Sequence, residues 1–500
     1  MRYFRNDESL LDREPRFDDY MLSLKSVRSL PRAMIGETKK AIAIARRFND
    51  EVVKPNALDL DYQMQENPDY LPWDFIETAN EWGFFTLFLP KMFGGAGLNF
   101  PAVSYFVEEI ATECLAMANL IGVHYLGVGT MCSSWNLRLM NRILKDTVRG
   151  EREKKPSIVS LAITEPGAGT DIEDVDLVSR GRVACEAKRV SGGYVLNGRK
   201  IFISNGHLST WHMALAYEDR KRPHETPVLL AIKTGMQGFS FGRQEHKMGQ
   251  RGCPASELIF EDCFVPDDQV ALDSGTIKKL DRSVTEVHER FLDFLLSSSR
   301  AGVGAFGAGV ARGAYERALA FASTEIVGGK PLIRHEWTQI RLAEMLKNVL
   351  IARLAYVESN YANGLYGMYK ILQKKPIFYA TKYTPRFIHN LFVSPLLNLS
   401  IVTRAFQKLN FDLQTEEERR CSSGWASMAK FCATDMGIEN CQLAVELMGE
   451  AGVRHDRGME KLLRDAKLLQ IYEGTNQLNR LNLFKTLIGK TTESKDIFED

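Results

Sequence analysis

Residues 463–480 read Leu463-Arg464-Asp465-Ala466-Lys467-Leu468-Leu469-Gln470-Ile471-Tyr472-Glu473-Gly474-Thr475-Asn476-Gln477-Leu478-Asn479-Arg480. This run places a carboxylate, Glu473, directly before a glycine, and Gly474 lets the backbone come close to a neighbouring group. A glutamate at such a point either favours the N-terminus of a following helix or acts as a base whose pKa is raised by burial. Taken alone, these residues leave both interpretations open.

A second run lies far upstream and reads Leu161-Ala162-Ile163-Thr164-Glu165-Pro166-Gly167-Ala168-Gly169-Thr170-Asp171. A short apolar strand ends at Thr164, and the Pro-Gly-x-Gly turn then brings bare backbone close to whatever lies beneath it. Such a loop suits a flat ring or a phosphate, although an ordinary β-turn has the same spacing. A third run, Lys247-Met248-Gly249-Gln250-Arg251-Gly252-Cys253, is followed by Leu258-Ile259-Phe260-Glu261-Asp262-Cys263-Phe264-Val265-Pro266 and by itself is typical of structural strands.

The hydrophobic rhythm divides the chain into three parts. Helical spacing dominates from about 30 to 157, for example in 35–53 and 102–120. Short alternating runs follow from 158 to 272, and the pairs Gly192-Gly193, Asn197-Gly198 and Asn205-Gly206 predict hairpins between them. Helical patterns return in 284–322, 338–362 and 424–448. The stretch 364–420, with Pro376, Pro385, Pro395 and a charged cluster at 416–420, interrupts the last part like an insertion.

The run Gly302-Val303-Gly304-Ala305-Phe306-Gly307 spells a dinucleotide-binding fingerprint, G-x-G-x-x-G. That fingerprint must follow a strand, whereas residues 284–296 have a helical pattern. We therefore expect a helix with small residues on one face, packed closely against its neighbours.

Composition excludes several classes of protein. The 500 residues include 64 Lys plus Arg and 63 Asp plus Glu, so no overall field draws the chain to nucleic acid. The 8 cysteines form no C-x-x-C pair, which predicts reduced thiols in a cytoplasmic setting and no metal site. The charged N-terminus does not resemble a secretory signal, and the absence of a run of about 18 apolar residues predicts no membrane span.

In their order and spacing, the three runs resemble the T-E-P-G-A-G-S-D, K-M-G-x-R with F-E-D-x-x-V-P, and R-D-A-K-x-x-x-I-Y-E-G-T segments of the acyl-CoA dehydrogenases. The resemblance covers about residues 35–495 apart from the insertion. It implies an α+β fold with an N-terminal helical domain, a central antiparallel β domain and a C-terminal domain of the four-helix-bundle type. We expect these domains at 1–157, with about 1–30 as an extension, at 158–272, and at 273–500 with an insertion at about 364–420.

The resemblance implies FAD as cofactor. In the family, the residues matching Ile163 and Thr164 hydrogen-bond the flavin ring, and the one matching Thr170 lies beside both flavin and acyl-CoA. Thr170 keeps the hydroxyl of a family serine, whereas Ala162 and Phe202 replace an aromatic residue and a tryptophan. The residues expected to bind the cofactor are Ile163, Thr164, Gly169, Thr170, Phe202, Ser204, Thr475, Gln477 and Gly449.

The resemblance also assigns the chemistry. Glu473 matches the base that abstracts the α proton of an acyl-CoA while the β hydrogen leaves as hydride to flavin N5, which gives the 2-enoyl-CoA. The backbone N-H of the same residue would hold the thioester oxygen. Some branches carry the base on a central helix just before an arginine, but the matching pair here is Ser299-Arg300, which leaves Glu473 as the base. The residues expected to bind substrate are Thr170, Arg300, Tyr472, Gly474 and Lys485.

Two departures from the family concern the substrate and the nucleotide end of FAD. Ala116 stands where glutaryl-type members carry an arginine, which argues against a decarboxylating enzyme for diacids. The family usually binds the FAD diphosphate across a subunit interface, with an Arg before F-G-K-P and a Q-x-x-G-G-x-G segment. Here Glu325 replaces that arginine, and Glu446 and Glu450 stand in the second segment.

The insertion carries a set of basic residues that we hypothesise to cover a CoA, flavin or partner surface, with a solvated excursion as the alternative. They are Lys374, Lys375, Lys382 and Arg386.

By resemblance, we expect a cytoplasmic flavoprotein oxidoreductase of fatty acid or carboxylic acid degradation. It would form a homotetramer or homodimer and pass electrons to an electron-transfer flavoprotein. Two alternatives stay open: an acyl-CoA oxidase or flavin monooxygenase of the same fold, and a binding protein that has lost the chemistry.

Overall fold

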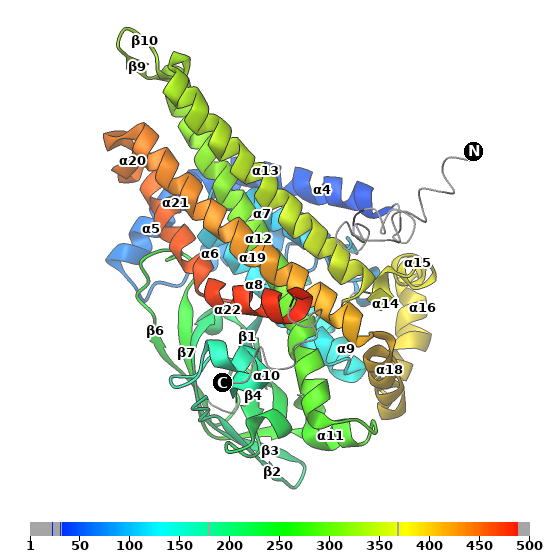
Figure 1. Cartoon of the computed structure of the whole chain (residues 1–500). Coiled ribbons are helices and arrows are strands. Elements are labelled where there is room, and N and C mark those ends of the chain that lie inside the picture. Colours follow the sequence, from blue (N-terminus) through cyan, green and yellow to red (C-terminus); the bar gives the residue numbers. More distant parts are fainter. Residues whose placement is uncertain (1–22, 24–30, 32, 179–180, 368–369, 489–500) are drawn as a thin grey trace, which may run out of the picture.

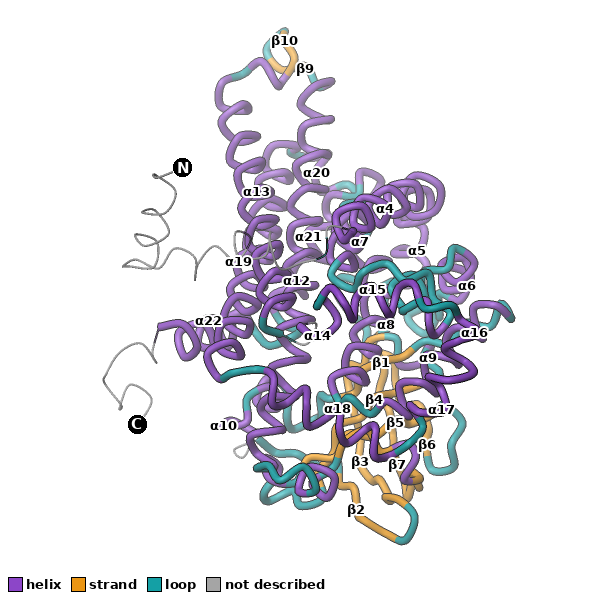
Figure 2. Tube along the Cα trace, turned by 90° about the vertical axis from the view of Figure 1, so that its right-hand side faces the viewer, coloured by secondary structure: helices purple, strands orange, loops and turns teal. Residues whose placement is uncertain are grey.

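The computed structural model describes residues 33–178, 181–367 and 370–488, together with Ser23 and Pro31. The extension expected at about 1–30 therefore lies almost wholly outside the described residues. Figures 1 and 2 show helices in the upper part of the molecule and the sheet at its lower end.

The N-terminal part is a layer of helices. Their bounds are α4 (Ala33–Phe48), α5 (Lys54–Glu66), α6 (Trp73–Glu81), α7 (Ala102–Ala111), α8 (Leu115–Ser133) and α9 (Leu137–Arg152). Helix α9 begins after Asn136, whose side chain accepts a hydrogen bond from the backbone N-H of Leu139, as is usual at a helix N-terminus.

Helix α8 is apolar on all sides because protein surrounds it. In the described part of the chain it is the one helix long and apolar enough to pass as a membrane span. However, 83% of its most apolar window is buried within the protein, as in the core helix of a soluble protein. The sequence criterion of an unbroken apolar run did not detect this helix.

Among the described residues, eight strands form one sheet. They are β1 (Val159–Ala162), β2 (Glu186–Val190), β3 (Gly193–Ser204), β4 (Trp211–Tyr217), β5 (Pro227–Lys233), β6 (Phe239–Gln244), β7 (Ala255–Pro266) and β8 (Val270–Leu272). Their order is β6-β7-β3-β2-β4-β5-β8, and β1 pairs with β4. The sheet is mainly antiparallel, as expected, but β4 pairs with β1 and with β2 in parallel.

Only one of the three predicted hairpins forms where expected. Gly192-Gly193 joins β2 to β3. Asn197-Gly198 instead lies inside β3, where the pairing with β7 shifts register and Gly198 takes a φ of 133° at a bulge. Asn205 ends β3 in the left-handed conformation and leads into a short 3-10 helix, Gly206–Leu208. Asn-Gly pairs favour positive φ, which bulges and strand ends use as well as hairpins.

Three long helices form the core of the C-terminal part: α12 (Val284–Thr324), α13 (Glu336–Leu365) and α19 (Glu416–Met448). Helix α12 contains the G-x-G-x-x-G run, so the prediction of a helix there is confirmed. Small residues let α12 approach α19 closely: a Cβ on Gly304 would lie 3.1 Å from Ala429 O, and one on Gly307 would lie 2.6 Å from Ala433 O. The hairpin of β9 (Ile326–Val327) and β10 (Lys330–Pro331) joins α12 to α13 and projects from the molecule (Figure 1).

Shorter helices complete the three parts of the chain. They are α10 (Val175–Val178), α11 (Ser274–Lys278), α14 (Lys370–Gln373), α15 (Lys375–Tyr383), α16 (Arg386–Ile388), α17 (Ser394–Leu397), α18 (Ser400–Leu413), α20 (Glu450–Val453), α21 (Met459–Lys467) and α22 (Asn476–Leu483). Brief 3-10 segments include η2 (Lys91–Phe93), η3 (Thr170–Glu173) and η10 (Leu468–Gln470).

The stretch predicted as an insertion packs on the N-terminal helices. Helices α17 and α18 contact α9, while α15 and α16 contact η2. The charged cluster at 416–420 does not belong to a loop, because it opens α19, where Thr415 and Glu418 cap the helix reciprocally.

Candidate active site

Glu473 lies in a tight loop between η10 and α22. Helix α22 begins at Asn476, and the Thr475 side chain accepts a hydrogen bond from the backbone N-H of Leu478. Glu473 itself takes a φ of 55°, a left-handed conformation that costs energy for a residue with a side chain. Such strain is often retained at a functional site.

The Glu473 carboxylate is held by a hydroxyl from α12. Ser299 Oγ donates a hydrogen bond to Glu473 Oε2. Ser299 occupies the position at which some family branches carry the base, and here that position carries a hydroxyl bonded to Glu473.

Two buried cations hold the backbone of the loop from opposite helices. From α12, Arg300 Nε donates to Glu473 O at 3.2 Å. From α19, Lys430 Nζ donates to Gly474 O and to Asn476 Oδ1, each at 2.7 Å. Asn479 Nδ2 adds a bond of 3.0 Å to Gly474 O. The carbonyl oxygens of the loop therefore face into the protein, and its conformation is fixed from several sides.

A second carboxylate joins this cluster. Glu173, at the end of η3, accepts a hydrogen bond of 3.2 Å from Arg300 Nη2. Glu173 and Glu473 thus approach one guanidinium, Glu173 through its carboxylate and Glu473 through its carbonyl oxygen.

Burial shifts the pKa of three side chains in the cluster, Glu473, Glu173 and Lys430. It raises the pKa of Glu473, although Ser299, Arg300 and Lys430 oppose that rise. It raises the pKa of Glu173 to about 7, with Arg300 opposing and Glu473 adding to the rise. It lowers the pKa of Lys430 to about 7, and the nearby Arg300 charge acts in the same direction. A carboxylate with a raised pKa is a stronger base near neutral pH.

The third run of sequence supports the loop from the sheet side. Gln250 Nε2 donates to Asp465 O at 2.9 Å and to Tyr472 Oη at 3.3 Å. Lys247 Nζ donates to Gln250 O at 2.7 Å, so it braces this turn and does not face solvent. The structure therefore joins the first and third signature runs through direct hydrogen bonds.

Two of the predicted flavin-ring segments, the turn after Thr164 and the end of β3, lie side by side. Ile201 N donates to Thr164 O at 2.9 Å, which brings the end of β3 beside the Pro-Gly-x-Gly turn. A Cβ on Gly169 would meet only Thr164 Cγ2, at 3.9 Å, so the turn has open space above it. Phe202 has a φ of 58° and a side chain that is 53% exposed. An exposed aromatic side chain next to an open glycine turn fits a flat ring such as the isoalloxazine of FAD.

An ion pair that the sequence reasoning did not identify anchors this turn. Lys200 and Glu165 are both fully buried, with 2.7 Å between Nζ and Oε1. Lys200 Nζ also donates to Ile163 O at 2.7 Å. The glutamate of the Thr-Glu-Pro-Gly run is therefore a structural anchor.

Not all predicted site residues lie close together. Lys485 ion-pairs with Asp174 at 3.1 Å, beside the segment that carries Thr170. Gly449 follows the last residue of α19 and, at about 1.5 Å per residue, lies about 28 Å along that helix from Lys430. Gln477 and Ser204 have no contact with the Glu473 cluster among the described interactions.

The acidic residues that depart from the family pattern, Glu325, Glu446 and Glu450, are exposed near the far ends of the long helices. These carboxylates would repel a pyrophosphate, so the segments that carry them do not fit the nucleotide end of FAD. The turn after Thr164, in contrast, fits the flavin ring.

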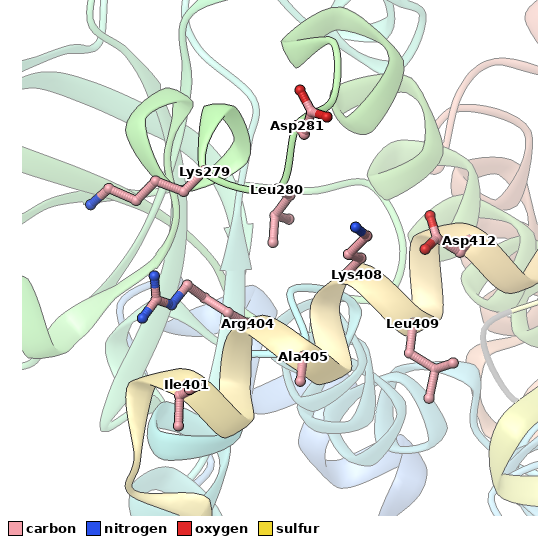
Figure 3. A pocket seen from close by; sticks show the side chains of 9 residues that line it. All are labelled: Lys279, Leu280, Asp281, Ile401, Arg404, Ala405, Lys408, Leu409 and Asp412. Carbon is pink, nitrogen blue, oxygen red and sulfur yellow. The ribbon is translucent and has the colours of Figure 1, made fainter.

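A surface hollow lies elsewhere. It has a volume of about 600 Å³ and is lined by Lys279, Leu280, Asp281, Ile401, Arg404, Ala405, Lys408, Leu409 and Asp412 (Figure 3). It separates α18 from the loop before α12, and its lining includes none of the predicted site residues.

The insertion's predicted basic residues lie away from this hollow. Lys382 ion-pairs with Glu37, and the Arg386 guanidinium lies against Gly94. These two residues therefore attach the insertion to the N-terminal helices.

Sequence reasoning missed Glu173, Lys430 and Gln250 as members of the site. Glu173 lies only three positions after Thr170, a predicted site residue, and this nearness in sequence was the one available signal. Lys430 gave no signal, because a lysine within a helical pattern is usually solvated.

The three domain models of one family match most of the chain. The N-terminal domain of acyl-CoA dehydrogenase matches residues 36–151, the middle domain 160–263, and the C-terminal domain 290–362 and 389–488. The unmatched stretch between these last two segments lies within the predicted insertion.

Individual proteins are similar over nearly the whole chain. A 3-(aryl)acrylate reductase of Clostridium sporogenes is 26% identical over 454 residues, which is 89% of this chain and 97% of the relative. A cyclohex-1-ene-1-carbonyl-CoA dehydrogenase of Syntrophus aciditrophicus is 26% identical and covers 90% of each chain. Butyryl-CoA dehydrogenase of Megasphaera elsdenii has the same fold, with a TM-score of 0.67 and 20% identity over 90% of this chain and 98% of that one.

The matched domains, their order and the fold agree, and this chain belongs to the acyl-CoA dehydrogenase family of FAD-dependent oxidoreductases.

Proposed function

We propose that the protein oxidises an acyl-CoA thioester to its 2-enoyl-CoA, with Glu473 as the base that removes the α proton. The observation that carries this proposal is the Glu473 carboxylate itself. It is partly buried, has a raised pKa, and stands on a strained loop held by Arg300 and Lys430. A base for a weakly acidic C-H bond needs this combination of basicity and fixed position.

The chain's residues would divide the work as follows. Ser299 orients the Glu473 carboxylate, while Arg300 and Lys430 bind carbonyl oxygens of the loop and leave the backbone N-H of Glu473 available for the thioester oxygen. Thr170, Tyr472, Gly474 and Lys485 are proposed to contact the substrate.

The ring of FAD is proposed to lie against Ile163, Thr164, Gly169, Thr170, Phe202 and Ser204, with Thr475 and Gln477 beside it, and when bound it supplies the acceptor for the β hydride. The nucleotide end of FAD is proposed to bind in a different arrangement from that of the family. Glu325, Glu446 and Glu450 lie in the segments that hold this end in the family, and their charge would repel a pyrophosphate beside Gly449.

We also propose that the protein works as a homodimer or homotetramer. Helix α13 and the adjoining hairpin expose large apolar side chains: Ile326 is 59% exposed, Trp337 51%, Ile340 64%, Leu350 50% and Leu354 64%. Several large exposed apolar side chains on one helix and its hairpin are typical of a subunit interface. Light scattering of the purified protein tests this directly.

Two further features of the proposal concern the setting of the reaction. The eight cysteines are all free thiols, which supports a cytoplasmic location. An electron-transfer flavoprotein is the proposed electron acceptor. Rapid formation of peroxide in air after reduction would instead indicate an oxidase.

The proposal is tested by mixing the purified flavoprotein anaerobically with a panel of straight-chain, cyclohexyl and arylalkyl acyl-CoAs while the flavin absorbance is recorded. At least one should bleach the flavin. Glu473→Gln should retain FAD and bind that acyl-CoA but reduce its flavin about 10²- to 10⁴-fold more slowly, the usual contribution of a general base. Glu81→Gln, which removes only an exposed ion pair with Lys154, is the matched control. Reduction of Glu473→Gln at the parent rate would refute the assignment.

A further inference from the structure

Glu173 has no task in the reaction proposed above, yet it belongs to the Glu473 cluster. Its side chain is only 16% exposed and ion-pairs with Arg300 at 3.2 Å. It also lies against the loop, because a Cβ built on Gly474 would be 2.6 Å from Glu173 Oε2. A second carboxylate near the first disfavours the ionised form of both, unless a nearby positive charge offsets the repulsion.

The three nitrogen atoms of the Arg300 guanidinium have different partners. Nε binds Glu473 O, Nη1 binds Ser427 Oγ at 3.2 Å, and Nη2 binds Glu173 Oε2. In the described part of the chain, Glu173 is the only carboxylate that ion-pairs with Arg300. The Glu473 carboxylate faces Ser299 instead. Arg300 therefore holds the backbone of the base while another residue balances its charge.

We infer that Glu173 is a positioning residue for Glu473: it takes up the charge of Arg300 and so keeps the base from becoming the partner of that guanidinium. The inference rests on the proposed function of Glu473. Without Glu173, the uncompensated guanidinium would attract and stabilise the Glu473 carboxylate, and a carboxylate stabilised in this way is a weaker base.

The charged surroundings agree with this role. The groups that act on the two carboxylates are Arg300 and Ser299 from α12 and Lys430 from α19. Asp435 acts on Lys430, and the Asp174–Lys485 pair lies next to Glu173 in the chain. Burial raises the pKa of Glu173, and the nearby Glu473 charge adds to the rise. The two carboxylates therefore titrate as a coupled pair, and removal of one charge changes the other.

A purely structural role makes a different prediction. If Glu173 only neutralised a buried arginine, its loss would destabilise the protein without moving the titration of Glu473. The two roles are separated by measuring the pKa of Glu473 directly in the FAD-loaded protein. Infrared difference titration of the parent against Glu473→Gln isolates the Glu473 carboxyl band and gives the pKa of Glu473 in the parent. The same comparison in a Glu173→Gln background gives the pKa of Glu473 when Glu173 is absent.

We expect Glu173→Gln to lower the pKa of Glu473 by about one unit, which is a tenfold change in the ionisation equilibrium. The acidic limb of the pH profile for flavin reduction should move to lower pH by a similar amount, and the plateau rate should fall. Glu173→Asp keeps the charge but withdraws it from Arg300, so its shift should be smaller and in the same direction.

The matched control is Glu113→Gln, which removes an ion pair of 3.0 Å with Arg317 on the same helix. It should leave the pKa of Glu473 unchanged. An unchanged or raised pKa of Glu473 in Glu173→Gln would overturn the inference, and Glu173→Asp decides in the same way if the glutamine variant does not fold. Because the infrared titration needs no substrate, it still decides the role of Glu173 if no acyl-CoA reduces the flavin.

Discussion

Ser299 Oγ donates a hydrogen bond to Glu473 Oε2 across 174 positions of sequence. The hydroxyl stabilises the charged form of the carboxylate, so Ser299→Ala should raise the pKa of Glu473 further. A hydrogen bond to a charged group contributes about 1.5–3 kcal/mol, which corresponds to a shift of about one pH unit or more. The acidic limb of the pH profile of kcat/KM should move to higher pH.

The control for this change is Ser297→Ala, on the same helix, whose hydroxyl bonds only the backbone carbonyl of Asp293. It should leave the profile unchanged. A shift of the Ser299→Ala limb toward lower pH would contradict the stated role of the hydroxyl.

The stability of the protein should depend on pH through Glu173. Its pKa in the folded protein is raised to about 7, so between about pH 4.5 and 7 the folded state binds more protons than the unfolded state. Stability from this group is therefore lost as the pH rises through that window, by up to about 3 kcal/mol. Urea unfolding at pH 5 and pH 7.5 should show Glu173→Gln gaining stability relative to the parent at the higher pH. A constant difference between the two proteins would show that Glu173 titrates normally.

Gly474 should not tolerate a side chain. Its φ is 76°, and an added Cβ would lie 2.6 Å from Glu173 Oε2 and 3.2 Å from Arg300 Nη2. Gly474→Ala should cost about 1–3 kcal/mol and slow flavin reduction at least tenfold, because the base is displaced. Gly235→Ala separates the two causes, since Gly235 has a φ of 88° but no atom within 4 Å of an added Cβ. Equal costs for both variants would mean that crowding by Glu173 contributes nothing.

The buried pair of Lys200 and Glu165 should be essential for the stability of the turn after Thr164. Lys200→Met leaves Glu165 buried without its partner and should lower the free energy of unfolding by about 3–5 kcal/mol in denaturant titrations. The exposed pair of Lys188 and Glu186 is the comparison, because Lys188→Met should cost less than about 1 kcal/mol. Similar costs at the two sites would argue against the assigned role of Lys200.

Some parts of this site follow from sequence and others do not. Glu473, Gly474 and the turn after Thr164 are local, since a distinctive string of neighbours defines each of them. The helix over Gly302–Gly307 was also predictable, because a dinucleotide fingerprint needs a strand before it. Asn197-Gly198 was misjudged because the positive φ that this pair favours serves a bulge as well as a hairpin.

The partners of Glu473 were beyond local patterns. Glu173 meets Arg300 across 127 positions, and Lys430 meets Gly474 across 44. These contacts exist only after α12, α19 and the sheet have packed together. A lysine or glutamate looks the same in sequence whether it faces water or another charge, so only the tertiary structure separates these residues from ordinary surface ones.

The close approach of α12 and α19 also positions the Glu473 loop, because each of these helices supplies one of the cations that bind it. Arg300 stands one turn before Gly304, and Lys430 directly follows Ala429, whose carbonyl Gly304 nearly touches. The two cations that bind the loop therefore lie on two different helices, and Gly304 sets the spacing between these helices. A methyl group at Gly304 would widen that spacing and weaken the hold on Glu473, so the placement of the proposed base depends in part on a residue that has no side chain.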